Sequence, residues 1–150
     1  MNHTLLFLCT GNYYRSRFAE LLFNALAAEA RLPWRASSRG LAIEKGNNNI
    51  GPISRTAVDT LRALGIDVEA AHRYPMQVQE QDLRQADVII ALQEVEHRPY
   101  LRARYPTWVE EVEYWHVRDM DPTPAYNPLQ EIAAEVRRLI RRLSGGEPLE

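Results

Sequence analysis

The chain has 150 residues, of which 25% are charged and 45% are hydrophobic. This length and composition predict one globular domain spanning residues 1–150. A net charge of −2 gives no global positive field, so we expect binding neither to nucleic acid nor to an anionic membrane surface. The longest apolar run is far shorter than the roughly 20 residues of a membrane span, and no basic leader segment with a cleavage site precedes it.

A single cysteine, Cys9, excludes both an internal disulfide and a four-thiolate metal site. Because a free thiol persists in a reducing compartment, the sequence predicts a cytoplasmic protein. Cys9 is expected to be either a small buried hydrophobic residue or a reactive group.

The first strand and helix are predicted near the N-terminus. Residues 4–8 form a short continuous apolar run, which is typical of a strand buried on both faces. A helix follows directly after Arg15, with Ser16 placed to cap its first turn. Its apolar residues recur at helical spacing and are Phe18, Leu22, Phe23, Leu26, Ala27 and Ala30.

A second strand and helix are predicted in the next segment. Residues 34–38 favour a strand, and residues 40–51 favour a loop because they hold three glycines and three consecutive asparagines. Ser54 can then cap a helix that ends at Gly65.

The second half of the chain continues the alternation. Residues 87–92 predict a strand with apolar side chains on both faces. A short helix follows over residues 95–105, which Pro99 either disturbs or starts. A fourth strand is predicted over residues 112–117.

The last helix is the best defined element of the sequence. It begins at Asn127 and Pro128, carries one apolar stripe, and stops at Gly145. The regular order of strand and helix predicts an α/β three-layer sandwich, with a four-stranded parallel sheet between helices on both faces. Ligands of such flavodoxin-like sheets bind beyond the carboxyl ends of the strands, where the loop after the first strand lies.

That loop, residues 9–16, has the composition of an oxyanion site. Gly11 and Asn12 tolerate positive φ, which lets successive backbone N–H groups point inward. These donors and the N-terminus of the following helix form a concavity suited to phosphate. The guanidinium of Arg15 can bind two phosphoryl oxygens at once and stays positive at any working pH.

The same positive surroundings predict a reactive Cys9. A thiol at a helix N-terminus beside a cation ionises more readily than an ordinary cysteine. We therefore expect a thiolate at neutral pH, aimed at phosphorus, with the Ser16 hydroxyl steadying it or helping it leave. Covalent phosphorylation of Cys9 is the predicted reaction.

The octet resembles the signature loop of the low molecular weight protein tyrosine phosphatase family. The matching residues are Cys9, Gly11, Asn12, Arg15 and Ser16. Further matches along nearly the whole chain are Ala19-Glu20, Ser38, Gly40, Gly65-Ile66-Asp67 and Asp121-Pro122. The resemblance implies the phosphotyrosine phosphatase I type of fold and a phosphate monoester hydrolase that acts through a cysteinyl phosphate. Its substrates would be phosphorylated proteins or small phosphoesters.

The resemblance also assigns roles to residues. Cys9 and Arg15 would be catalytic, and Asp121 would be the general acid, with Asp119 as the rival. Ser38 and His72 would support the loop. The phosphate would be bound by Thr10, Gly11, Asn12, Tyr13, Tyr14, Arg15 and Ser16.

No metal or other cofactor is expected. His3, His97 and His116 show no metal-ligand spacing with one another or with carboxylates. The proposed chemistry needs only the nucleophile, the cation and the acid.

Some positions depart from the family pattern and leave alternatives open. Tyr14 stands where many relatives have a second cysteine, and Thr123-Pro124 replaces aromatic residues that wall a phosphotyrosine cleft. An arsenate reductase using an external small thiol remains an alternative function, as does a non-catalytic phosphate-binding module. The physiological substrate and the oligomeric state are left open by the sequence.

Overall fold

The structure is a computed structural model and describes residues 2–68, 73–118 and 127–145. Four strands form one parallel sheet in the order β2-β1-β3-β4. They are β1 (His3–Cys9), β2 (Trp34–Gly40), β3 (Val88–Ala91) and β4 (Glu113–Tyr114). Because all four run in the same direction, their carboxyl ends meet at one edge of the sheet, where Cys9 lies beside Gly40.

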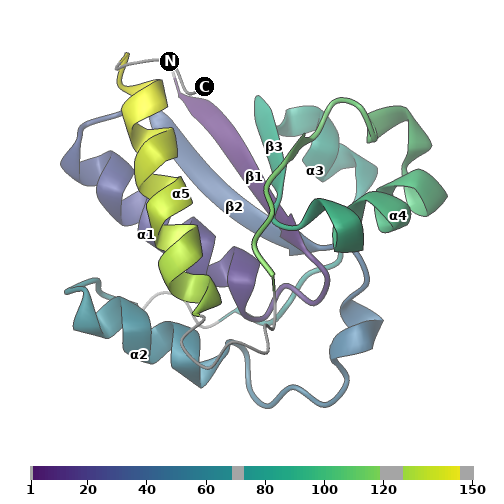
Figure 1. Ribbon diagram of the computed structural model, residues 1–150, viewed down its shortest axis with the longest axis horizontal. Coiled ribbons are helices and arrows are strands. Elements are labelled where there is room, and N and C mark those ends of the chain that lie inside the picture. Colours follow the sequence, from purple (N-terminus) through teal and green to yellow (C-terminus); the bar gives the residue numbers. More distant parts are fainter. Residues whose placement is uncertain (1, 69–72, 119–126, 146–150) are drawn as a thin grey trace.

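Helices cover both faces of the sheet (Figure 1). Helices α1 (Arg15–Glu29) and α5 (Pro128–Leu143) pack on one face, with α2 (Arg55–Ala63) against α1. Helices α3 (Glu80–Gln85) and α4 (Glu94–Arg104) pack on the other. The predicted three-layer α/β fold with a four-stranded parallel sheet is confirmed.

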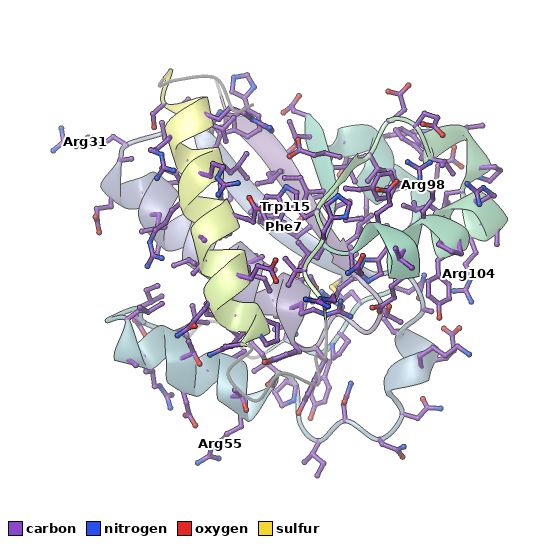
Figure 2. The ribbon with its side chains drawn as sticks, viewed as in Figure 1. Phe7, Arg31, Arg55, Arg98, Arg104 and Trp115 are labelled. Carbon is purple, nitrogen blue, oxygen red and sulfur yellow. The ribbon has the colours of Figure 1, made fainter. Side chains whose placement is uncertain are left out.

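The central strand β1 is buried on both faces because each face has its own hydrophobic cluster. Leu5, Phe7 and Cys9 point toward α1 and α5, whereas Leu6 and Leu8 point toward α3 and α4. On the first face the Phe7 and Trp115 rings are 5.8 Å apart between their centroids and lie beside α5 in the view of Figure 2. This packing holds the end of β1, and hence Cys9, in place.

The helix boundaries predicted from capping residues agree with the structure at two helices. The Ser54 hydroxyl accepts a hydrogen bond from the backbone N–H of Ala57 at the start of α2, and Gly65 follows the helix with φ 81°. Helix α5 begins at Pro128 after Asn127, as predicted. Within the described residues, no helix is both long and apolar enough to cross a membrane.

Ser16 is not the cap of α1, contrary to the prediction. The helix begins at Arg15 with Tyr14 in the cap position, and no side chain caps it. The Ser16 hydroxyl lies inside the first turn, 2.9 Å from the Cys9 sulfur. Its side chain therefore serves the loop rather than the end of the helix.

The structure differs from the predicted elements at four other places. The loop over residues 40–51 contains a short 3-10 helix, η1 (Ile43–Gly46), and α3 was not predicted because it has only one buried apolar residue, Leu83. Strand β4 has only two paired residues instead of six. Pro99 lies inside α4, so of its two predicted effects the structure excludes a start of the helix.

Removing the cap of α5 is expected to lower stability measurably. The Asn127 side-chain oxygen accepts a hydrogen bond from the backbone N–H of Leu129, at 2.9 Å. Asn127→Ala should therefore reduce the free energy of unfolding by about 1 kcal/mol, the usual value for a lost N-cap. Urea unfolding would measure this, with Gln130→Ala, on the exposed side of the same helix, as the control. Equal losses in both variants would contradict the prediction.

Candidate active site

The loop between β1 and α1 turns sharply at the carboxyl edge of the sheet. Asn12 has φ 53°, whereas Gly11 is not in the left-handed region, so only one of the two residues expected to use positive φ does so. The loop passes so close to Gly40 that a Cβ there would lie 2.9 Å from the Thr10 carbonyl oxygen. Gly40 thus allows β2 to support the loop from beside it.

Cys9 lies at the base of this loop with its sulfur held by a hydroxyl. Only 3% of Cys9 is exposed, and its Sγ is 2.9 Å from the Ser16 Oγ. The Ser16 oxygen accepts a hydrogen bond from the Asn12 side-chain amide, also at 2.9 Å. This leaves the Ser16 hydrogen available to the sulfur, which is the contact that stabilises a thiolate.

A polar network behind the loop fixes the Asn12 side chain. Its amide donates to the Ser38 hydroxyl at 2.9 Å, and Ser38 in turn donates to the Glu20 carboxylate at 2.6 Å. Arg73 donates to the Asn12 side-chain oxygen at 2.9 Å, to the Ser38 hydroxyl at 3.0 Å and to Glu20 at 3.2 Å. Since Asn12 is fully buried, these partners determine the shape of the turn.

Arg17 is a second cation directly behind the loop, and it is 1% exposed. Its guanidinium donates to the backbone oxygens of Asn12, Pro52 and Arg73, at 3.4, 3.0 and 2.9 Å. Burial, followed by the nearby Arg73 charge, lowers the pKa of Arg17 to about 10, while Glu20 and Cys9 act in the opposite direction. Arg17 therefore remains charged at neutral pH and adds positive potential beneath the loop.

Arg15 lies at the start of α1 and is 5% exposed. One terminal nitrogen of its guanidinium donates to the Glu96 carboxylate at 2.9 Å, and the other donates to the Val117 carbonyl oxygen at 3.5 Å. Glu96 comes from α4 and also accepts a hydrogen bond from the Thr10 hydroxyl. Contacts from two separate segments, α4 and the residues after β4, thus orient the guanidinium.

A cavity of about 500 Å³ opens over the loop. The Tyr13 hydroxyl donates to the Ile50 carbonyl oxygen at 2.6 Å, which joins the loop to the segment before α2. The lining residues are Cys9, Thr10, Gly11, Tyr13, Tyr14, Arg15, Lys45, Gly46, Asn49, Ser54, Thr56 and Glu96. A second cavity of about 640 Å³ beside α1 contains neither Cys9 nor Arg15, so these two residues meet only in the first of the two cavities.

The structure brings together the site residues expected from the loop. Six of them line the cavity, and Asn12, Ser16 and Ser38 lie directly behind it. Asp121, Asp119 and His72 lie outside the described residues, so their roles stay predictions.

Two residues of the site were not anticipated from the sequence. Arg73, next to His72, makes the contacts expected of a loop-supporting residue. Glu96 contacts Arg15 and Thr10 from α4. A Glu in the first turn of a helix is usually a solvated surface residue, so no local pattern pointed to this role of Glu96.

Comparison with known proteins agrees with this geometry. The family model of the low molecular weight phosphotyrosine protein phosphatases matches residues 4–145. Curated proteins gave no match. Among solved structures, the low molecular weight protein tyrosine phosphatase from T. tengcongensis is 27% identical, with a TM-score of 0.69 over 95% of this chain and 97% of that one.

Two further solved structures are similar to this chain. YfkJ from Bacillus subtilis is 29% identical, with a TM-score of 0.65 over 97% of this chain and 91% of that one. The YwlE arginine phosphatase from Geobacillus stearothermophilus is 22% identical, with a TM-score of 0.64 over 95% and 91%, and shares the fold. The family match over most of the length, joined to a cysteine and an arginine in one loop-lined cavity, shows that this chain belongs to the low molecular weight phosphotyrosine protein phosphatase family and is a phosphatase.

Proposed function

We propose that this phosphatase hydrolyses phosphate monoesters through a phosphorylated Cys9. The observation that carries the proposal is the cavity shared by the Cys9 sulfur and the Arg15 guanidinium, at the N-terminus of α1. The helix N-terminus and the guanidinium both favour a phosphate dianion in front of the sulfur. Phosphate binding and attack by the Cys9 sulfur would therefore occur at the same place.

In the first step, the Cys9 thiolate forms a bond to phosphorus while the bond from phosphorus to the leaving oxygen breaks. Asp121 supplies the proton that the leaving oxygen needs. In the second step, a water molecule gives its proton to Asp121 and attacks phosphorus. The sulfur–phosphorus bond breaks, which restores the thiolate and releases inorganic phosphate.

Arg15 and the loop backbone stabilise the charge on the phosphoryl oxygens during both steps. The fixed contacts of Arg15 support this role because they hold the guanidinium before substrate arrives. The network of Arg73, Ser38 and Glu20 supports it from behind by holding Asn12 in its turn.

The decisive experiment is acid quenching during turnover. The purified protein should hydrolyse an aryl phosphate in the presence of a chelator, and mass spectrometry of the quenched protein should find phosphate on Cys9. Hydrolysis without any phosphorylated Cys9 would contradict the mechanism.

Arsenate with added glutathione serves as a parallel assay of arsenate reduction, because the lone Cys9 could reduce arsenate only with an external thiol.

The general acid can be identified with a matched pair of variants. Asp121→Asn should lower kcat by about 10²- to 10⁴-fold, the usual contribution of a positioned acid. Asp119→Asn, two residues earlier, should lower it by less than about threefold, as expected for a solvated aspartate outside the chemistry. Steady-state kinetics with p-nitrophenyl phosphate measures both, and the reverse pattern would assign the role to Asp119.

The substrate class can be measured directly as kcat/KM on a panel of phosphotyrosyl, phosphoseryl and phosphoarginyl peptides. We propose a cytoplasmic phosphorylated protein or small phosphoester as the natural substrate. Tyr13 and Tyr14 line the cavity and offer aromatic surfaces on which a phosphotyrosine ring can pack. A preference for phosphotyrosyl over phosphoarginyl peptides would support that packing.

A further inference from the structure

One carboxylate oxygen of Glu96 accepts two hydrogen bonds and lies close to a third nitrogen. The Thr10 hydroxyl and the Arg15 guanidinium donate to Oε2, the second at 2.9 Å, and the Nε2 of His97 lies 3.3 Å from the same oxygen. The other ring nitrogen of His97 accepts the backbone N–H of Gln93, at 3.1 Å. A neutral His97 therefore carries its hydrogen on Nε2, facing Glu96.

These contacts keep Glu96 ionised. Partial burial alone would raise the pKa of Glu96, but the nearby His97 nitrogen, the hydrogen bonds from Arg15 and Thr10, and the Arg15 charge outweigh it. The pKa of Glu96 is held well below its usual range. Glu96 is therefore ionised at neutral pH.

Glu96 is thus a fixed negative charge that orients its partners. An arginine side chain has many rotamers, and holding it in one of them before the substrate binds avoids an entropic cost during the reaction. Glu96 lies on α4, and its contacts join that helix to both ends of the loop, at Thr10 and Arg15. The carboxylate is thus placed to set the direction of the guanidinium.

We propose that Glu96 is a positioning residue that aims the Arg15 guanidinium at the phosphoryl group in the transition state. This role rests on the proposed function of Arg15. The Glu96 charge repels a bound phosphate and a transition state alike, so removing the charge alone should not weaken phosphate binding and should leave the barrier from the bound state unaffected. The orientation of Arg15 matters most when the phosphoryl group transfers, so its loss should lower kcat.

The test is the split between kcat and anion binding in Glu96→Gln. We expect kcat for p-nitrophenyl phosphate to fall about 10- to 100-fold, as for a misplaced catalytic group. The inhibition constant of inorganic phosphate should stay the same or decrease, because one negative charge has been removed from the cavity. Glu94→Gln is the matched control, since Glu94 lies on the same helix and pairs with Arg98 at 2.9 Å instead; its kcat should stay within about twofold of wild type.

Glu96→Asp separates orientation from charge. It keeps the negative charge but withdraws the carboxylate from Arg15 by one methylene group. If orientation matters, Glu96→Asp also loses kcat while its phosphate inhibition stays at the wild-type value. Full activity in Glu96→Asp would show that the position of the carboxylate does not set kcat, and it would overturn the proposal.

The controls distinguish this inference from the proposed function. Circular dichroism and thermal melting would show that each Glu96 variant is folded at the assay temperature. Active wild-type protein together with an unchanged kcat in Glu96→Gln overturns the role of Glu96 alone. Absence of hydrolysis by the wild-type protein overturns the proposed function itself.

Discussion

Cys9→Ser is expected to abolish hydrolysis, with kcat reduced by about 10⁴-fold or more. A serine hydroxyl at this position stays protonated at neutral pH, and no described residue that contacts Cys9 is a base. The surrounding donors stabilise an anion but do not remove a proton from an alcohol. Steady-state kinetics with p-nitrophenyl phosphate in the presence of a chelator measures the loss.

The same variant should still bind phosphate. The groups proposed to bind the phosphate are the loop backbone and Arg15, and Cys9→Ser alters neither of them. Isothermal titration with inorganic phosphate should therefore give an affinity within about tenfold of the wild-type value. Retained turnover in Cys9→Ser would mean that water or another nucleophile attacks phosphorus directly, contrary to the proposed intermediate.

Asn12→Ala is expected to damage both stability and activity. The buried Asn12 side chain donates to Ser16 and Ser38 and accepts from Arg73 and from the backbone N–H of Met76. Its removal takes one hydrogen bond from each of these four groups, and alanine is also strained at φ 53°. The free energy of unfolding should fall by about 3 to 5 kcal/mol, and kcat/KM should fall by about 100-fold.

Asn12→Gly separates the two causes. It removes the same side chain but accepts positive φ without strain. Urea unfolding should therefore find Asn12→Gly more stable than Asn12→Ala by about 1 kcal/mol, with activity equally low in both. If either variant kept wild-type activity, the side-chain network of Asn12 would not determine the shape of the loop.

The parts of the molecule that were predictable from the sequence are those encoded by neighbouring residues. The buried run of β1, the capped start of α2 and the octet that contains Cys9 and Arg15 each lie within a short segment. Their structure follows from hydrophobic pattern, capping and turn preferences, which act locally. Sheet order and layers then follow from the regular alternation of strand and helix.

The parts that were not predictable depend on distant contacts. Arg73 is 61 positions from its partner Asn12, and Glu96 is 81 positions from Arg15. No local pattern distinguishes either residue from an ordinary surface charge. The prediction that Ser16 caps α1 was wrong for a similar reason. A serine at a helix start fits a cap, but here its hydroxyl contacts the Cys9 sulfur.

The contacts of the buried Arg17 limit how the entrance of the cavity can be engineered. Its guanidinium holds carbonyl oxygens from three stretches of chain, one of which is Pro52 in the turn before α2. Lengthening that turn to admit bulkier substrates would withdraw an acceptor from a cation that has almost no access to water. Designs that reshape specificity should therefore alter side chains such as Lys45 and Asn49, which line the cavity, and preserve the length of the turn at Pro52.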